Sequence, residues 1–548
     1  MKNGIYRRII AAVISAGLVL TSVVVSPQGA VQVEAAARTV AIRSCVIQGP
    51  NVVTTVHADQ LPASDDGVYY LYANEVYQDG PVGQNVAQAP IAADTQLVCP
   101  LNFGAPDNNM MRKFIVCVRQ GGSMQQVSDE HYITNPEAVA TETSRRNDHG
   151  IKGILPHVAE ASTFKDLGVA QMVYNLYLGD IVGPSSDPAL PTIEFPYCGN
   201  VYQFNTKALQ QYDGFVGWCS GNGFQLTMTI INNKTAAGAD LIHPLARDGH
   251  VCPGYAMNTK EPGGTAHLKA IATFLAARYS GTDGHGQVDN WVIGNEVNAR
   301  TEWYHMSSAN LELNVSEYVK AFRIFYNGIK SVNGNARVYN SIDQEWGRKS
   351  NPGCFLSREY LDRFTYYMNR EGNIDWGLSF HPYNAPLYDP YAWKQQSCWV
   401  RNDQSTPYIT MENIDLLTGY MSQPGYLAPN GQVRSISISE IGYTSSFGED
   451  IQAASIVYGY LMAASNPHID AFILYRETDD AHEMQSNIAQ GLKRPDGSQK
   501  PSYACYKALG TGNQGSAVQL ASQVIGQDVQ AMVNSRTFLL RGGWDLNS

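Results

Sequence analysis

The spacing of apolar residues changes character near residue 145. Residues 38–140 contain short runs of alternating apolar and polar positions, such as VAIRSCVIQ, GVYYLYANEVY and KFIVCVRQ, separated by Gly, Pro, Asn and Asp. Alternation with a period of two predicts half-buried β-strands. Several short strands at this spacing predict a small all-β, sandwich-like domain. The polar run TETSRRNDHG ends this region.

After this boundary, strand-like and helix-like segments alternate along the chain. The segments predicted as strands are residues 169–178, 201–204, 224–231, 290–296, 336–343, 374–383, 433–442 and 471–477. Segments between them, such as AHLKAIATFLAARYS and SEYVKAFRIFYNGIKS, carry apolar residues at helical spacing. This rhythm across residues 150–510 predicts an α/β fold, a (β/α)8 TIM barrel. A doubly wound sheet is the rival, but no glycine-rich nucleotide fingerprint follows any of these strands.

The first residues predict a leader rather than part of the fold. Lys2, Arg7 and Arg8 precede an apolar run over residues 9–25, and Ala35 closes a small-residue cleavage site. This is the layout of a secretory signal peptide, residues 1–35. We therefore expect a secreted, extracellular protein with no membrane contact after cleavage. The alternative is an uncleaved membrane anchor, although the run is at the short end of the roughly 17–25 residues that a span needs.

Composition narrows the possible functions. The chain has 548 residues, 44% hydrophobic and 16% charged, with a formal net charge of −11. It lacks the basic excess of a nucleic-acid-binding protein. Its nine cysteines show no C-x-x-C clustering, which disfavours a zinc site. Cys99 and Cys117 either form a disulfide bridge or are free and buried. We expect a monomer without cofactor, ending in a C-terminal extension over residues 511–548.

Two glutamates fall at the same end of the predicted barrel. Asn295 and Glu296 close the fourth predicted strand, and Glu440 lies near the end of the seventh. The C-terminal strand ends of such a barrel, with the loops after them, form its active face. Both carboxylates are therefore expected to point into one cleft. Retaining glycoside hydrolysis uses such a pair, one protonated and one ionised, about 5–5.5 Å apart.

This arrangement resembles clan A of the retaining glycoside hydrolases, which are built on (β/α)8 barrels. In that clan an Asn–Glu pair ends the fourth strand and a lone Glu ends the seventh. The resemblance covers roughly residues 150–510 and is closest to an uncharacterised family of secreted bacterial barrel proteins. It implies that Glu296 is the acid/base, Glu440 the nucleophile, and Asn295 the partner of the sugar 2-hydroxyl. It also implies an oligo- or polysaccharide substrate.

Further residues at the same face are candidates for substrate contact. The sequence SFHPYN ends the sixth predicted strand with His381 and Tyr383. In clan A a tyrosine near this point often hydrogen-bonds the nucleophile, so Tyr383 is either that residue or a plain packing tyrosine. Asn232 follows the third predicted strand and could contact sugar hydroxyls, but asparagine is also a common turn residue.

Tryptophans favour a sugar substrate, because the C–H face of a pyranose stacks on an aromatic ring. Trp303, Trp346, Trp393 and Trp399 all fall in predicted loops after strands four to six. Any of them could instead pack within its loop. The segment from Asn384 to Thr406 is the best candidate for a lid or a subsite wall.

Two departures from the clan pattern stand out. Many members carry an arginine at the end of strand two, and none is located here. Many also end strand eight with tryptophan, where this chain has Tyr475 and Arg476. Arg476 is a candidate to supply the missing positive charge. The carboxylates that follow strands five and eight are expected to make internal pairs or to bind substrate: Asp343, Glu345, Glu477 and Asp479.

Two other classes of function compete. A non-catalytic carbohydrate-binding barrel would be marked by loss of either glutamate, and both are present. A metal-dependent barrel hydrolase would usually carry His-x-His on its first strand, where this chain has QMVYNLYL. We therefore predict no metal and a secreted retaining glycoside hydrolase that degrades a carbohydrate.

Overall fold

Eight parallel strands close into a barrel. The computed structural model describes residues 38–144, 150–157 and 159–541. The barrel strands, in spatial order, are β9 (Lys152–Ile154), β10 (Gln171–Tyr177), β13 (Gln225–Ile231), β14 (Asn290–Ile293), β15 (Arg337–Asp343), β16 (Gly377–His381), β17 (Ile436–Ile441) and β18 (Ile469–Leu474). β18 pairs back onto β9 and closes the ring. The predicted α/β class and (β/α)8 barrel are confirmed.

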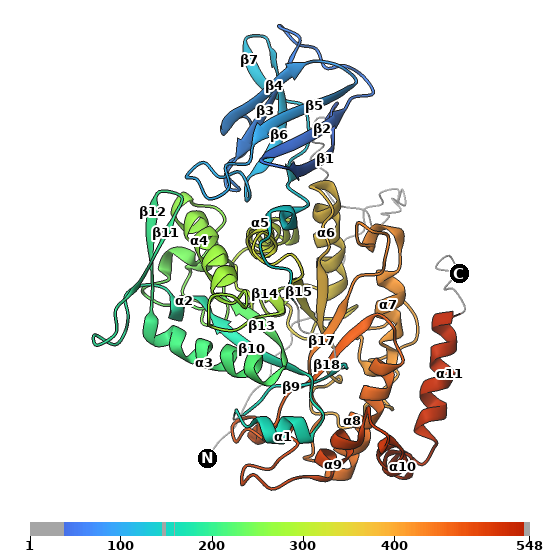
Figure 1. Ribbon diagram of the computed structural model, residues 1–548. Helices are drawn as coiled ribbons and strands as arrows, with labels where there is room; N and C mark the ends of the chain where they lie inside the picture. The colour runs from blue at the N-terminus through green and yellow to red at the C-terminus, as the bar shows by residue number, and fades with distance from the viewer. Residues whose placement is uncertain (1–37, 145–149, 158, 542–548) are drawn as a thin grey trace, which may run out of the picture. The chain divides into compact units, whose positions relative to one another are not determined.

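The barrel strands are covered on both faces. β13 (QLTMTII) and β14 (NWVI) are buried along their whole lengths. Parallel strands in such positions carry continuous apolar runs rather than alternation. Figure 1 shows helices around the strands. The helices after successive strands are α1 (Ala161–Asp166), α2 (Leu178–Ile181), α3 (Thr206–Asn222), α4 (Pro262–Arg278), α5 (Leu311–Lys330), α6 (Ser357–Arg370), α7 (Asp415–Met421), α8 (Glu449–Ala464) and α9 (Pro501–Ala508).

The predicted strand list is wrong at its start. The segment predicted as the first strand, residues 169–178, is β10, the second barrel strand, because β9 precedes it. The segment predicted as the second strand, residues 201–204, belongs to β12 (Asn200–Phe204), which forms an antiparallel two-stranded sheet with β11 (Ile193–Tyr197). The two errors cancel, so β14 and β17 remain the fourth and seventh strands. β9 has only three residues, too few to show a period.

The region before the barrel consists of antiparallel strands, as predicted. One sheet has the order β1 (Ala41–Gln48), β2 (Asn51–His57), β5 (Asp94–Pro100). The other contains β4 (Gln84–Pro90), β3 (Val68–Asn74), β6 (Lys113–Gln120) and β7 (Ser123–Gln126), and β8 (His131–Tyr132) pairs with β6. Cys99 and Cys117 are both buried and lie in different sheets, and no disulfide bridge joins them.

Hydrogen bonds join this β region to the barrel helices. The backbone N–H of Tyr132 in β8 donates to the carbonyl of Glu371, at the end of α6, over 2.9 Å. The side-chain amide of Asn327 in α5 donates to the carbonyl of Met110 over 2.8 Å. The β region is therefore fixed on α5 and α6.

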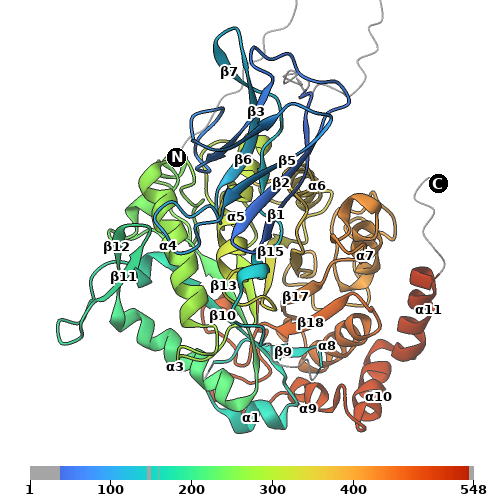
Figure 2. The ribbon, with the colours of Figure 1, turned by 45° about the horizontal axis from the view of Figure 1, so that its top comes forward.

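The chain end adds two helices to the outside of the barrel. In the predicted C-terminal extension, α10 (Gln514–Ile525) and α11 (Val529–Arg541) follow α9. Figures 1 and 2 both show α10 against α8 and α9. Across the described ranges no helix is long and apolar enough to cross a membrane. The predicted signal peptide lies outside the described residues.

Candidate active site

Glu296 stands in a strained turn just after β14. Gly294 has φ +79°, and a Cβ there would lie 2.7 Å from Val297 Cγ1, so only glycine fits. Glu296 itself has φ +40°, a conformation rare for a residue with a side chain. Its N–H donates to Ser341 Oγ over 3.1 Å, and the next N–H, from Val297, donates to the Ser341 carbonyl over 2.9 Å. Strain of this kind persists where surrounding contacts impose it, commonly at functional sites.

His381, the last residue of β16, contacts the Glu296 carboxylate. Its Nδ1 lies 2.8 Å from Glu296 Oε1, and its Nε2 lies 3.1 Å from Ser439 Oγ. The two side chains are only 3% and 14% exposed. Burial lowers the pKa of His381, but the charge of Glu440, the bond to Glu296 and the charge of Asp343 outweigh it, so the pKa is raised. A protonated imidazole would donate to Glu296 and fix its orientation.

Glu440 lies near the end of β17. Its partner is Tyr383, which follows β16 two residues after His381. The Tyr383 hydroxyl donates a hydrogen bond of 2.8 Å to Glu440 Oε1. Burial raises the pKa of Glu440 and the nearby charge of Glu296 adds to this, whereas the charge of His381 and the Tyr383 bond lower it; the net shift is upward. The end of β16 therefore supplies one partner to each glutamate.

Asp343 is a third carboxyl at this face. It ends β15, is 5% exposed, and is paired across the sheet with His381. Its Oδ1 accepts hydrogen bonds from Ser357 Oγ (2.6 Å) and from the N–H of Glu345 (2.8 Å). Burial, helped by the charge of Glu296, raises the pKa of Asp343.

The predicted roles of Asn232 and Arg476 do not fit their surroundings. Asn232 is 2% exposed, and its amide donates to the carbonyls of Leu241, Tyr255 and Ala256, so it organises the loop after β13. Arg476 pairs with Asp480 (3.1 Å) and Glu483 (3.4 Å). Its charge is therefore neutralised by carboxylates of its own loop rather than by Glu440. Asn295 is 8% exposed and directly precedes Glu296.

Of the candidate tryptophans, one is buried in the core and others are half-buried. Trp346 is 2% exposed and meets Tyr420 edge to face at 4.9 Å, which corrects its predicted role as a sugar platform. Trp303 is half-buried in the turn after β14. Trp393 is half-buried and meets Tyr391 edge to face at 5.5 Å.

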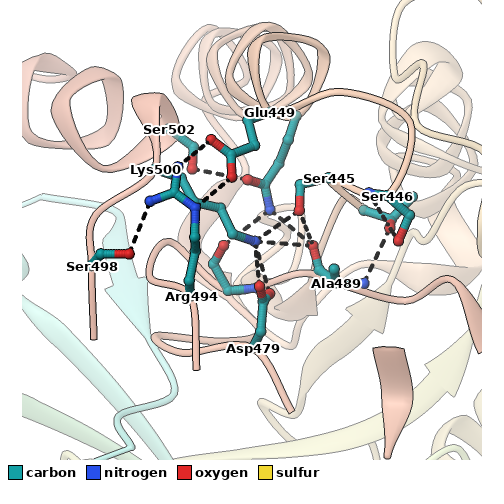
Figure 3. A network of polar contacts seen from close by, with 12 residues as sticks. Ser445, Ser446, Glu449, Asp479, Ala489, Arg494, Ser498, Lys500 and Ser502 are labelled. Carbon is teal, nitrogen blue, oxygen red and sulfur yellow. Dashed lines mark hydrogen bonds and ion pairs between the residues drawn. The ribbon is translucent and has the colours of Figure 1, made fainter. Parts of the chain in front are cut away.

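The carboxylates after β18 make internal pairs, as predicted. Glu477 binds Lys493 at 2.9 Å, and Asp479 binds Lys500 at 2.7 Å. Figure 3 shows how Lys500 also reaches Ser445, in the loop after β17, over 2.8 Å. These contacts tie the loop after β18 to the loop that follows Glu440.

Three polar residues of this site were missed as site residues: Ser341, Ser439 and Ser357. Ser341 and Ser439 point inward from β15 and β17, and strand serines carry no distinctive signal. A signal did exist for Ser439, because it directly precedes Glu440 in SISISEIGY. Within the described ranges, no cluster of three or more His, Cys, Asp or Glu side chains has the arrangement of metal ligands.

The chain folds as a (β/α)8 barrel, with one glutamate just after its fourth strand and another near the end of its seventh. The chain belongs to a protein family described as "Family of unknown function (DUF5722)", whose model matches residues 144–532. The match covers the barrel and reaches into α11. None of the curated proteins matches the chain.

Several solved structures are similar at low identity. A family 39 glycoside hydrolase from the gut symbiont Bacteroides cellulosilyticus WH2 is 16% identical, over 83% of this chain and 79% of that one, with a TM-score of 0.41. A glucosidase from Croceicoccus marinus is 13% identical, over 67% and 68%, with a TM-score of 0.42. A β-glucuronidase from Bacteroides uniformis is 11% identical, over 86% and 49%, with a TM-score of 0.38. At such TM-scores, function has to be inferred from the site.

Proposed function

We propose that this protein is a retaining glycoside hydrolase, with Glu296 as general acid/base and Glu440 as nucleophile. The observation that supports this assignment is the pair of hydrogen bonds made by the end of β16. His381 bonds Glu296 and Tyr383 bonds Glu440, at 2.8 Å each. The two carboxyl groups therefore have different hydrogen-bond partners. A general acid/base and a nucleophile need such different environments.

The reaction proceeds in two displacements. Glu440 attacks the anomeric carbon, the glycosidic C–O bond breaks, and the leaving oxygen takes the proton of Glu296. Glu296, now ionised, removes a proton from water, whose oxygen displaces Glu440 and releases the sugar. Burial opposes the ionised form of Glu440 that the first step needs. The Tyr383 bond and the charge of His381 favour that form.

The substrate in this proposal is an oligo- or polysaccharide. In this proposal Asn295, next to Glu296, bonds the sugar 2-hydroxyl, and Trp303, in the turn after β14, stacks on a neighbouring sugar. Hydroxyl contacts at the reacting sugar contribute several kcal/mol when they strengthen in the transition state.

Kinetics of two variants test the assignment. With an activated aryl glycoside, Glu296→Ala should keep the first step but slow the second, and azide should restore turnover to a glycosyl azide of retained configuration. The loss should grow with poorer leaving groups, within the roughly 10²–10⁴-fold typical of general acid–base catalysis. Glu440→Ala should lose activity on every leaving group, and azide should give the inverted product.

A crystal structure gives an independent check. A retaining pair has carboxyl groups about 5–5.5 Å apart, whereas roughly 6.5–9.5 Å indicates inversion. If the wild-type protein cleaves no aryl glycoside and no polysaccharide, or if both variants behave alike, the proposal is wrong. A non-catalytic carbohydrate-binding barrel would then be the better description.

We also propose that the protein is exported and that its leader is removed. The basic start, the apolar run and Ala35 support this. Sequencing the amino terminus of the secreted protein should give a start close to Ala36. A mature chain that still begins at Met1 would indicate a membrane-anchored protein instead.

A further inference from the structure

A cavity of about 650 Å³ opens beside the loop that follows β16. Three segments line it: residues 386–396 of that loop, Phe447 in the turn before α8, and Val524–Ile525 at the end of α10. Its lining includes neither glutamate of the candidate active site nor His381 or Tyr383. It is therefore a separate site, within the roughly 300–1,000 Å³ of ordinary ligand pockets.

Four aromatic rings gather in this cavity. Tyr388, Tyr391, Trp393 and Phe447 belong to its lining. Tyr388 and Phe447 are 51% and 53% exposed, and Tyr391 is 39% exposed. Large aromatic side chains left open to water in one place commonly mark a binding site.

Polar groups lie among these rings. Asp389, Lys394 and Gln396 also line the cavity. A pyranose ring has an apolar C–H face that an aromatic ring covers and hydroxyl groups that need hydrogen-bond partners at the rim. Aromatic rings interspersed with amide, carboxylate and ammonium groups match both needs.

The loop that carries three of the rings is held in place. The N–H of Ala392 donates to Ser455 Oγ in α8 over 3.1 Å, and Ser455 in turn donates to the carbonyl of Pro390. The side-chain amide of Gln395 donates to the carbonyl of Tyr391 over 2.7 Å and accepts from the N–H of Ala385 over 3.0 Å. Little conformational freedom remains to be lost when a ligand binds.

The turn that carries Phe447 is held as well. Figure 3 shows Ser445 bound by Lys500 and, after the turn, Glu449 paired with Arg494 at 2.7 Å. Phe447 thus projects from a segment fixed on both sides. The rings are therefore carried on backbone segments that are held in place before a ligand binds.

We propose that this cavity is an accessory carbohydrate-binding site that holds a saccharide chain away from the active site. The class of ligand rests on the proposed function, whereas the existence of the site rests on the cavity and its rings. Because the loop begins directly after Tyr383, the accessory site and the active site share one connected, rigid segment.

Affinity electrophoresis tests the proposal without catalysis. The Glu440→Gln variant is run through gels that contain xylan, mixed-linkage β-glucan, galactomannan, arabinan or pectin. We expect retardation by at least one polymer. Phe447→Ala and Tyr388→Ala, placed in the same background, should each weaken that retardation about threefold to tenfold, the range expected for one aromatic contact.

Phe103→Ala is the matched control, because Phe103 is 49% exposed but lies in the β region. It should bind as the parent does. Equal retardation of the parent, Phe447→Ala and Tyr388→Ala overturns the proposal, and so does a parent that no polymer retards. Retardation that depends on Phe447 in a protein without hydrolytic activity would uphold the accessory site and reject the glycosidase assignment.

Discussion

The Tyr383 hydroxyl and the Glu440 carboxylate are joined by a hydrogen bond of 2.8 Å between the ends of two neighbouring strands. Hydrogen bonds to an ionised partner are roughly twice as strong as neutral ones. The bond therefore favours the charged form of Glu440, whose burial works in the opposite direction.

Tyr383→Phe should move the acidic limb of the pH profile of kcat/KM to higher pH. Loss of the phenol removes one of the two interactions that lower the pKa of Glu440. A hydrogen bond to a charged group is worth about 1.5–3 kcal/mol, which corresponds to a shift of roughly 1–2 pH units. Tyr366→Phe, an exposed tyrosine of α6, is the control and should keep the wild-type profile. An acidic limb that stays in place would contradict the role of Tyr383.

Asp343→Asn should lower the pKa of His381. Asp343 is one of three carboxylates, with Glu440 and Glu296, that raise the pKa of this buried imidazole. Asparagine keeps an oxygen that accepts from Ser357 and Glu345, so the fold should survive. We expect this fall in the NMR titration of the His381 ring, whose signal is assigned with His381→Asn. Glu359→Gln, exposed on α6, should leave the titration unchanged.

Asp479→Asn should destabilise the loops shown in Figure 3. Lys500 and Asp479 are 1% and 3% exposed, so the variant leaves a buried ammonium without its counter-charge. Breaking such a buried pair costs about 3–5 kcal/mol of the free energy of unfolding. Glu449→Gln breaks the neighbouring Arg494 pair, which is 39% and 31% exposed, and should cost less than about 1 kcal/mol. Urea unfolding compares the two, and equal losses would contradict this ranking.

Glu371→Gln should weaken the dependence of stability on pH. Burial raises the pKa of Glu371 to about 7, although Arg323 nearby lowers it, and Oε2 has no hydrogen-bond partner among the described residues. The folded protein therefore holds a proton that the unfolded chain releases between about pH 4 and pH 7. Its contribution to stability is present below pH 4 and is lost as pH rises through 7, by at most roughly 3 kcal/mol.

Urea unfolding at pH 5 and pH 8 measures this loss. The wild-type protein should be less stable at pH 8 than the Glu371→Gln variant, and the two should be similar at pH 5. Glu359→Gln again serves as the control. A variant that loses stability at both pH values would show that the carboxylate form is needed beside Arg323.

The barrel could be predicted because several of its buried strands are long. β13 and β15 each have seven residues and are almost wholly apolar or buried, which gives a clear signal. β9 has three residues, and its position is set by pairing with β10, the next strand, and with β18, which lies far from it in the sequence. The hairpin strand β12 has the same local pattern as a barrel strand, and only tertiary pairing distinguishes the two.

Some residues of the candidate site could likewise be predicted from the sequence, and others could not. That Glu296, His381, Tyr383 and Glu440 lie together could be predicted, because strand ends carry a positional meaning in a barrel. Asn232, Trp346 and Arg476 stand at equally suggestive positions, but each is used by its own surroundings, as a loop anchor, a core ring and an ion-pair partner. Whether a polar side chain is already bonded depends on partners from other loops, which local sequence does not contain.

The closure of the barrel through β9 sets a condition on how the chain is made. Lys152 pairs with Phe472, so the ring stays open until nearly all of the barrel has been synthesised. Until then β9 and the most recently made strand are both unpaired edges, the kind of surface on which nascent chains associate wrongly. Translation that stalls anywhere between these two strands leaves a product with two open edges, which proteases and chaperones should recognise even though most of its helices can already form.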